Sequence, residues 1–208
     1  MSLNVNLGWQ RNLLEESADH AKMVHLNRPF LLDHQLAKLQ DLGDEFPARK
    51  IDILWKAADG PEGLEAAVEC ISQEAERAVN EGVRILVLSD RGVDHEKVPI
   101  PALMAIGAIH EHLNHKHLRM RASIVIETGE VRDTHSAAVM FGFGAQAICP
   151  YLAVDTVREI LEKDTRGKLG DLTPTQAVAN YLQALEKGVL KIMSKMGISV
   201  LSSYQGAQ

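Results

Sequence analysis

The segment RILVLSDRG, residues 84–92, decides the predicted fold, because a run of aliphatic residues ends abruptly in charged residues and glycine. A second segment, ASIVIETGEVRD at residues 122–133, repeats the pattern. Short runs rich in Val, Ile and Leu, bounded by polar residues, are typical of strands that are buried on both faces of a parallel sheet. Each segment therefore predicts one central strand with a charged loop at its carboxyl end.

Outward from these two segments, short apolar runs alternate with amphipathic stretches. The predicted strands are Ile51–Trp55, Arg84–Ser89, Ala122–Glu127 and Ala145–Cys149. Helical spacing of apolar residues predicts helices between Pro61 and Gly82, and over Pro101–His117, Val131–Phe143 and Val154–Lys163. Alternating β-α units imply an α/β fold with a mainly parallel sheet and right-handed crossovers. Residues 50–163 are accordingly predicted to be one α/β domain.

Helical segments are predicted on both sides of this domain. Residues 1–49 are predicted to be a helical lead-in, with helices near Asn12–Leu26 and Asp33–Leu42 and with Asp33 as an N-cap. The polar stretch 164–173 is predicted to be a linker. Thr173 followed by Pro174 predicts the start of a helix that runs to Gly197. No closing element is predicted after that helix, which suggests a unit that is incomplete within 174–208.

The composition excludes several classes of protein. The 208 residues carry 22 Lys and Arg against 28 Asp and Glu, with only four Phe, two Trp and three Tyr, so nucleic-acid binding is not expected. The uncharged stretch 136–154 is interrupted by Gly and Pro, so we expect no membrane span. Cys70 and Cys149 lie far apart and form no metal-binding or disulfide pattern. A reducing, cytoplasmic location is therefore expected.

The candidate site lies where the predicted strands end, because ligands of parallel α/β sheets tend to bind beyond the carboxyl ends of the strands. Six residues share this edge: Asp90, Arg91, Glu127, Glu130, Arg132 and His135. In one interpretation Arg91 or Arg132 binds a carboxylate. Glu127 or His135 would then transfer a proton. In the favoured interpretation, Asp90 and Arg91 pair with Glu127 and Arg132 as a structural network, or dock a neighbouring domain.

Three other motifs give weaker predictions. The segment 142–147, GFGAQA, has the spacing of a dinucleotide fingerprint, but a helix enters it and a strand leaves it, the reverse of the required order. The histidines of 110–117 lack the spacing of a zinc site and suit the end of a helix, so no metal site is predicted. Ser194, Lys195 and Met196 end the last predicted helix, where they could approach an anionic cofactor.

Several stretches together resemble one family, the large subunit of glutamate synthase. They run in the order of that family and are MSLNVNLGWQRNLLEESADHA (1–21), RPFLLDHQLAKL (28–39), ILVLSDRGVDHEKVPIPALMAIGAIHEHL (85–113), IVIETGEVRDTHSAAVMFGFGAQAICPYLA (124–153), AVANYLQALEKGVLKIMSKMGIS (177–199) and SYQGAQ (203–208). The stretch MSKMGIS is highly specific. Local departures from the family pattern are Cys149, where Asn is usual, Val200, where Thr is usual, and Gln205, where the family varies.

The resemblance implies a place within a larger enzyme of ammonia assimilation and glutamate biosynthesis. Residues up to 163 would belong to the central domain, which joins a glutamine amidotransferase domain to an FMN-binding barrel, and residues 174–208 would begin that barrel. The family makes two glutamates from glutamine, 2-oxoglutarate and reductant. It uses FMN and an iron–sulfur cluster, which carries in electrons from ferredoxin or from an electron-donating subunit.

For this segment the resemblance implies a structural, tunnel-supporting role. Ser194, Lys195 and Met196 would lie on the FMN side. The isolated chain is expected to bind no cofactor, to be inactive and to self-associate through exposed domain interfaces. The alternative is a stand-alone α/β module that binds a small carboxylate.

Overall fold

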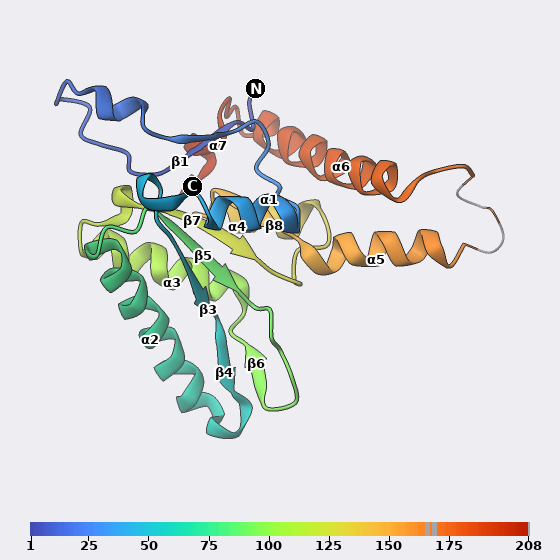
Figure 1. The fold of residues 1–208 in the computed structure, drawn as a ribbon, viewed down its shortest axis with the longest axis horizontal. Helices are drawn as coiled ribbons and strands as arrows, with labels where there is room; N and C mark the ends of the chain where they lie inside the picture. The colour runs from blue at the N-terminus through green and yellow to red at the C-terminus, as the bar shows by residue number, and fades with distance from the viewer. Residues whose placement is uncertain (165–166, 168–169, 208) are drawn as a thin grey trace.

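A four-stranded parallel sheet forms the centre of the molecule (Figure 1). A computed structural model describes residues 1–164, 167 and 170–207. The strands are β3 (Ala48–Asp52), β5 (Ile85–Ser89), β7 (Ser123–Glu127) and β8 (Ala147–Cys149), and they lie in that order. All residues of β5, β7 and β8 are buried, as the apolar runs predict. The predicted α/β fold with a mainly parallel sheet is confirmed.

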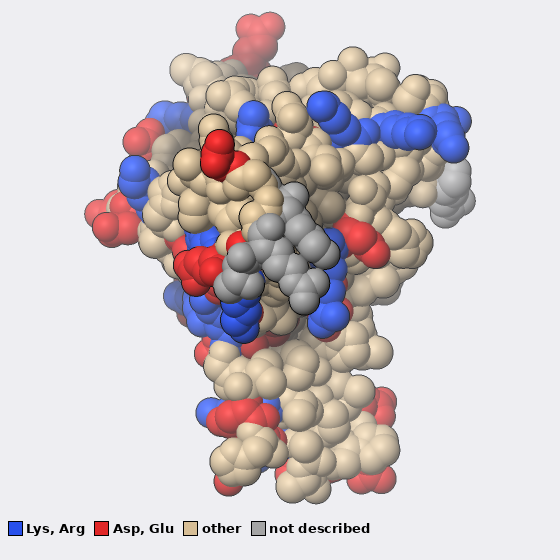
Figure 2. Space-filling view, turned by 90° about the vertical axis from the view of Figure 1, so that its right-hand side faces the viewer, with Lys and Arg blue, Asp and Glu red and all other residues tan. Residues whose placement is uncertain are grey.

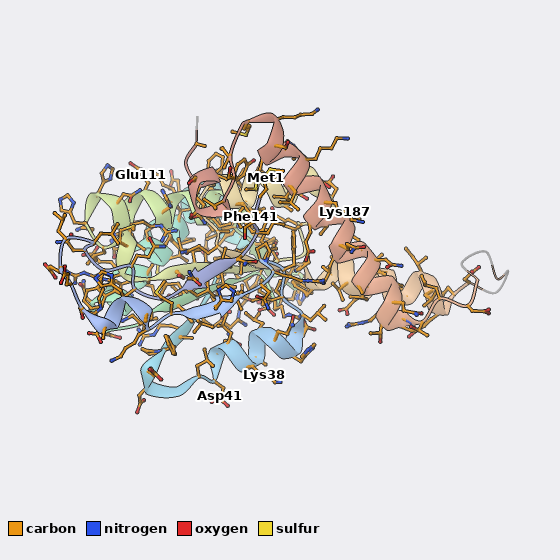
Figure 3. All side chains as sticks on the ribbon, turned by 90° about the horizontal axis from the view of Figure 1, so that it is seen from above. Met1, Lys38, Asp41, Glu111, Phe141 and Lys187 are labelled. Carbon is orange, nitrogen blue, oxygen red and sulfur yellow. The ribbon has the colours of Figure 1, made fainter. Side chains whose placement is uncertain are left out.

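The strand order follows the chain order, so right-handed crossovers place the connecting helices on one face of the sheet. These helices are α2 (Gly60–Asn80), α3 (Ala102–His115) and α4 (Thr134–Gly142), and α5 (Tyr151–Glu162) follows β8. Helix α1 (Asp33–Gln40) covers the opposite face, as the view from above shows (Figure 3). Phe141, at the centre of that view, is fully buried and packs edge-on against Phe30.

The predicted helix Asn12–Leu26 is wrong. This part of the chain forms an antiparallel pair, β1 (Val5–Leu7) and β2 (Val24–Leu26), joined through a loop and the 3-10 turn η1 (Ala18–Ala21). The backbone bonds here reach across the sequence: the Gly8 N–H donates to Ser123 Oγ, and the Gln10 N–H donates to the Met120 carbonyl. A local periodicity argument cannot detect such partners.

The predicted strand Ile51–Trp55 is divided in the structure. After β3 the chain leaves the parallel sheet at Ile53, and β4 (Leu54–Lys56) pairs antiparallel with β6 (Lys97–Pro99). Ile53 links both sheets, because its N–H donates to the Ser89 carbonyl and its carbonyl accepts from Ile100. The remaining 3-10 turns are η2 (Gly43–Glu45), η3 (Ala57–Asp59) and η4 (Arg119–Arg121).

The C-terminal helix α6 (Pro174–Lys195) begins as predicted, since the Thr173 side chain accepts the Gln176 N–H. Its apolar residues join the same hydrophobic core as the sheet, packed beside α4 and α5. After α6 the chain forms a short helix that was not predicted, α7 (Leu201–Tyr204), which buries Leu201 and Tyr204 against α4. The incompleteness of the unit 174–208 stays a prediction. The proposed domain division at residue 174 stays a prediction. Residues 165, 166, 168 and 169 of the predicted linker lie outside the described residues.

As expected, a helix (α4) leads into the segment 142–147 and a strand (β8) follows it, the reverse of the order in a dinucleotide-binding motif. Gly144 has a φ of 114°, and a Cβ there would collide with the His110 ring. His110 accepts from Nε of the buried Arg119, whose other nitrogens donate to the Ala122 and Gly144 carbonyls. Burial lowers the pKa of Arg119 to about 10 and also lowers the pKa of His110. Gly144 therefore leaves room for the His110 ring, which packs beside the buried Arg119 guanidinium.

No helix in the described part of the chain combines the length and the apolar composition needed to cross a bilayer.

Close packing of α6 on α4 gives a test of this arrangement. A Cβ at Gly188 of α6 would collide with the Thr134 side chain. Because of this collision, we expect Gly188→Ala to lower the free energy of unfolding by about 1–3 kcal/mol. At a helical site with open space, the same substitution would instead raise it by up to about 1 kcal/mol. Thr134→Ala should restore part of the loss. Urea denaturation measures both.

The matched control is Gly107→Ala on α3, where the added Cβ meets only the Phe143 ring, which is half-exposed, at 3.3 Å. That variant should stay within about 1 kcal/mol of the parent chain. Equal stabilities of Gly188→Ala and Gly107→Ala would contradict the packing of α6 on α4.

Candidate functional site at the carboxyl edge of the sheet

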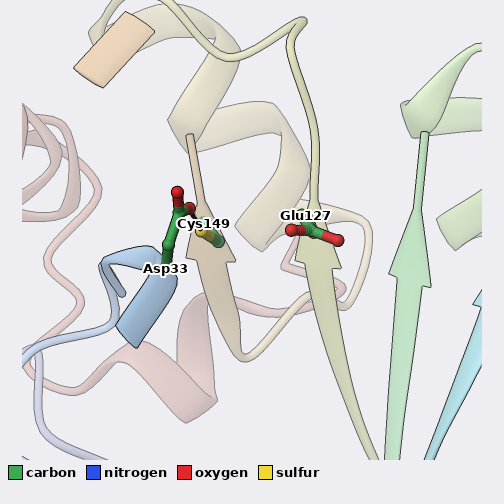
Figure 4. Close-up of side chains that lie close together, drawn as sticks. All are labelled: Asp33, Glu127 and Cys149. Atoms are coloured by element: carbon green, nitrogen blue, oxygen red, sulfur yellow. Dashed lines mark hydrogen bonds between the residues drawn. The ribbon is translucent and has the colours of Figure 1, made fainter. Parts of the chain in front are cut away.

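Three neighbouring strands end in side chains that meet at one edge of the sheet. Strand β5 ends at Ser89, β7 at Glu127 and β8 at Cys149, and all three residues are buried. Asp33, at the start of α1, approaches the same place from the other side (Figure 4). The site therefore combines the sheet edge with a helix from the N-terminal part of the chain.

Arg91 is the central cation of this site. Its Nε donates to Glu127 Oε1 at 2.5 Å, and its Nη2 donates to Asp33 Oδ1 at 2.6 Å. The guanidinium carbon lies 4.1 Å from the centre of the Tyr151 ring, a cation–π contact. Burial works against the charged guanidinium, but Glu127 and Asp33 outweigh it and raise the pKa of Arg91. Arg91 thus stays charged and ties α1 to β7.

Hydrogen bonds satisfy the two buried carboxylates at this edge. The second oxygen of Glu127 accepts from Ser89 Oγ at 2.6 Å. Asp90 accepts from Thr128 Oγ1 at 2.6 Å and from the Gly129 N–H at 2.9 Å. Burial, followed by a hydrogen bond with Asp90, raises the pKa of Tyr151 to about 12. Both acids are therefore engaged in holding the loops after β5 and β7.

Cys149 is 1% exposed, and its Sγ lies 3.5 Å from Asp33 Oδ1. Burial, and then the neighbouring Asp33 and Glu127 charges, raise the pKa of the thiol far above its ordinary value. Ligand atoms of Asp33, Glu127 and Cys149 lie within 4.8 Å of one another, which is close enough to share a cation. Arg91 already pairs with both carboxylates, and the thiol is protonated, so a metal ion would have to displace Arg91. The geometry favours an ion-pair cluster.

The structure brings together three of the six predicted edge residues, Asp90, Arg91 and Glu127. Glu130 lies apart and accepts the Ala102 N–H at the start of α3. Arg132 and His135 are exposed beside the start of α4. The predicted Arg91–Glu127 pair is confirmed. The predicted pairing of Asp90 with Arg132 is wrong, because Asp90 bonds to Thr128 and Gly129.

Sequence reasoning missed Asp33, Cys149 and Tyr151 as members of this site. Asp33 was expected to be the N-cap of α1, but the N-cap is Leu32, whose N–H donates to Gln35. The Asp33 carboxylate is thereby available for Arg91, 58 residues further along the chain. Only one signal in the sequence pointed to Cys149, its place at the end of a predicted strand, where edge residues are sought.

The predicted FMN-side residues Ser194, Lys195 and Met196 are exposed at the end of α6. The C-terminal pole of a helix is negative, which disfavours a phosphate. Lys187, Lys191 and Lys195 recur every four residues along this helix, and a row of basic side chains is visible on the face in Figure 2. Ser194, Lys195 and Met196 do not by themselves form a binding site for a flavin, and their assignment to the FMN side stays a prediction.

Comparison with known proteins gives the family. The sequence matches the glutamate synthase central domain over residues 1–208. The chain belongs to the glutamate synthase central domain family. Relatives include a ferredoxin-dependent glutamate synthase of Pyropia yezoensis, 40% identical over all of this chain, and a chloroplastic one of Oryza sativa subsp. japonica, 42% identical over all of it. The large chain of a Bacillus subtilis NADPH glutamate synthase is 38% identical over 97% of it.

The central domain accounts for a small part of these relatives, since the chain spans 14% of the Pyropia protein and 13% of each of the other two. Solved structures share its fold at low sequence identity. A flavocytochrome b2 variant has a TM-score of 0.54 and is 13% identical over 84% of this chain and 38% of its own. A mandelate oxidase variant has a TM-score of 0.51 and is 17% identical over 85% of this chain and 61% of its own.

Burial of Cys149 in the central domain gives a chemical test. Cys70 is exposed, whereas the Cys149 thiol is buried and has a raised pKa. In the folded chain we expect a thiol-specific reagent to modify Cys70 rapidly and Cys149 only very slowly, even at pH 9, because the thiolate is the reactive form. Both should react in urea.

Cys70→Ser is the control for this assignment and should leave no rapidly reacting thiol in the folded chain. Rapid modification of Cys149 in that variant would show that the edge of the sheet is open, in contradiction to the described burial.

Proposed function

We propose that this chain is the connecting central domain of a glutamate synthase, with a structural and tunnel-supporting role. Its neighbours in the same enzyme would be the glutamine amidotransferase domain and the FMN barrel domain. The family match over the whole chain is the main support. The carboxyl edge adds to it, because its acids, cation and hydroxyls are occupied with one another. Such an edge favours holding neighbouring elements in place over turning over a substrate.

The complete enzyme would convert glutamine, 2-oxoglutarate and reductant into two glutamates. FMN and an iron–sulfur cluster would belong to the complete enzyme, and this segment alone would bind neither of them. The relatives include ferredoxin-dependent, NADH and NADPH enzymes, so the proposal covers either kind of electron donor. We place the protein in the cytoplasm, whereas the rice relative is chloroplastic.

Exposed apolar side chains support contact with neighbouring domains. Leu13 and Leu14 are 89% and 91% exposed in the loop between β1 and β2, and Phe143 and Ile160 are about half exposed. Adjacent fully exposed leucines cost hydration free energy unless another surface covers them. We therefore expect the isolated chain to self-associate through these positions.

A second candidate function is binding of a small carboxylate at the same edge. The observation that favours it is the Arg91 side chain, which is 35% exposed and lies over the Tyr151 ring. A carboxylate reaching that open side would compete with Asp33 for the guanidinium.

Ligand binding by the purified chain separates the two candidates. The central-domain proposal predicts a colourless chain, no glutamate formation, and no change of melting temperature with FMN, 2-oxoglutarate, glutamate or glutamine. Stoichiometric FMN or glutamate formation would overturn it. A saturable thermal shift with one carboxylate would favour the binding module if Arg91→Gln or Arg132→Ala removes it. Arg49→Gln, at an exposed ion pair with Glu81, is the matched control.

A further inference from the structure

A buried guanidinium without an acidic partner lies at the amino edge of the sheet, opposite the Arg91 site. Arg119 is 9% exposed, and its nitrogens donate to His110 Nδ1 and to the Ala122 and Gly144 carbonyls, which are neutral acceptors. Burial alone lowers its pKa to about 10, so the guanidinium stays charged at neutral pH. Among the residues that the structure describes, no carboxylate pairs with it. A buried charge without a counter-charge is costly.

A cavity of about 230 Å³ opens beside this guanidinium. Arg119 and Gln146 are buried lining residues, whereas Gln10, Asn114 and Ser202 line it from exposed positions. A second cavity, of about 360 Å³, shares Gln10, Gln146 and Ser202 with the first. Of the described residues that line either cavity, none is acidic. The space beside Arg119 is therefore open to solvent and free of competing carboxylates.

The amide nitrogen of Gln146 is an unused donor in this cavity. Gln146 is 5% exposed, and its Oε1 accepts the Ile124 N–H at 2.8 Å, which fixes Nε2 as the free end of the amide. Nε2 has no hydrogen-bond partner in the described part of the chain. There, the one fully enclosed side-chain atom without a partner is Glu186 Oε1, so Gln146 Nε2 must be open to the cavity. A donor in such a place favours an acceptor from outside the chain.

His110 and Arg119 add further donors. Because His110 Nδ1 accepts from Arg119 Nε, the neutral imidazole carries its proton on Nε2. The bonds of Arg119 to Ala122 and Gly144 leave a second N–H free on Nη1 and on Nη2. Both residues line the same cavity as Gln146. Donors from α3, from η4 and from the residue before β8 therefore surround one space.

We propose that this cavity binds a phosphate group, either free inorganic phosphate or the phosphate of a small phosphate ester. Arg119 provides the positive charge, and Gln146 and His110 provide neutral donors. A tetrahedral oxyanion offers oxygens in several directions, which suits donors from three elements, whereas a carboxylate accepts in one plane. This site is independent of the function proposed above, because it lies at the opposite edge of the sheet from Arg91 and shares no residue with that site.

Isothermal titration calorimetry of the 208-residue chain tests the binding. The titrants are inorganic phosphate, glycerol 3-phosphate and acetate at pH 7, with chloride keeping the ionic strength constant. We expect saturable binding of a phosphate group at one site per chain. Acetate should bind about tenfold more weakly, because it lacks oxygens for all the donors. The two phosphate series show whether the free ion or the ester is preferred.

Variants then locate the site. Gln146→Glu keeps the acceptor for the Ile124 N–H but replaces the free donor by a negative charge, so it should weaken phosphate binding by about tenfold or more. Asn114→Asp places a charge at an exposed lining position and should weaken binding by about threefold, because water screens it. Circular dichroism would check that both variants are folded.

Gln176→Glu is the matched control for Gln146→Glu. Its Oε1 likewise accepts a backbone N–H, that of Thr173 at 3.0 Å, and it lies outside the cavity lining. That variant adds the same charge and should bind phosphate as the parent chain does.

Three results would overturn the proposal. One is a heat signal for phosphate that does not saturate and equals that of chloride, which would indicate screening only. Another is acetate binding as tight as phosphate binding. The third is saturable phosphate binding that stays unchanged in folded Gln146→Glu and Asn114→Asp, which would place the anion elsewhere.

Discussion

The Arg91 guanidinium joins the ends of three elements at the carboxyl edge of the sheet. It pairs with Glu127 at the end of β7, with Asp33 at the start of α1, and lies on the Tyr151 ring at the start of α5. Glu127 is almost fully buried, and a buried carboxylate without a cation is costly. Arg91 therefore adds to the contacts that hold α1 over the open face of the sheet, which include the buried Leu36 and Leu39 and the backbone hydrogen bond from Leu31 to Ile148.

The two edges of the sheet have opposite electrostatic character. At the carboxyl edge, the carboxylates of Asp33, Asp90 and Glu127 are satisfied by Arg91, hydroxyls and backbone N–H groups. At the amino edge, Arg84 and Arg121 lack such partners in the described residues. In the proposed role of a domain that connects larger domains, a self-contained edge would be an advantage, since a satisfied network keeps its shape whatever its neighbours do.

The sequence predicts the parts of the structure that local patterns govern. Strands β5 and β7 follow from continuous aliphatic runs, and α6 from the Thr173–Pro174 start, whose capping contact is local. Asp90, Arg91 and Glu127 could be foreseen because parallel strands align their carboxyl ends. The β1–β2 pair could not, since each strand has three residues and depends on distant partners. Asp33 was missed for the same reason, being 58 residues from Arg91.

The most direct test of this account is a double-mutant cycle on Arg91 by urea denaturation, combining Arg91→Gln with Glu127→Gln and separately with Asp33→Asn. The account predicts a coupling energy of about 1–3 kcal/mol with the buried Glu127, and about 0.5–1 kcal/mol with Asp33, whose side chain is half exposed. Effects that add to within about 0.3 kcal/mol in both cycles would contradict it, because Arg91 would then not hold α1 and β7 together.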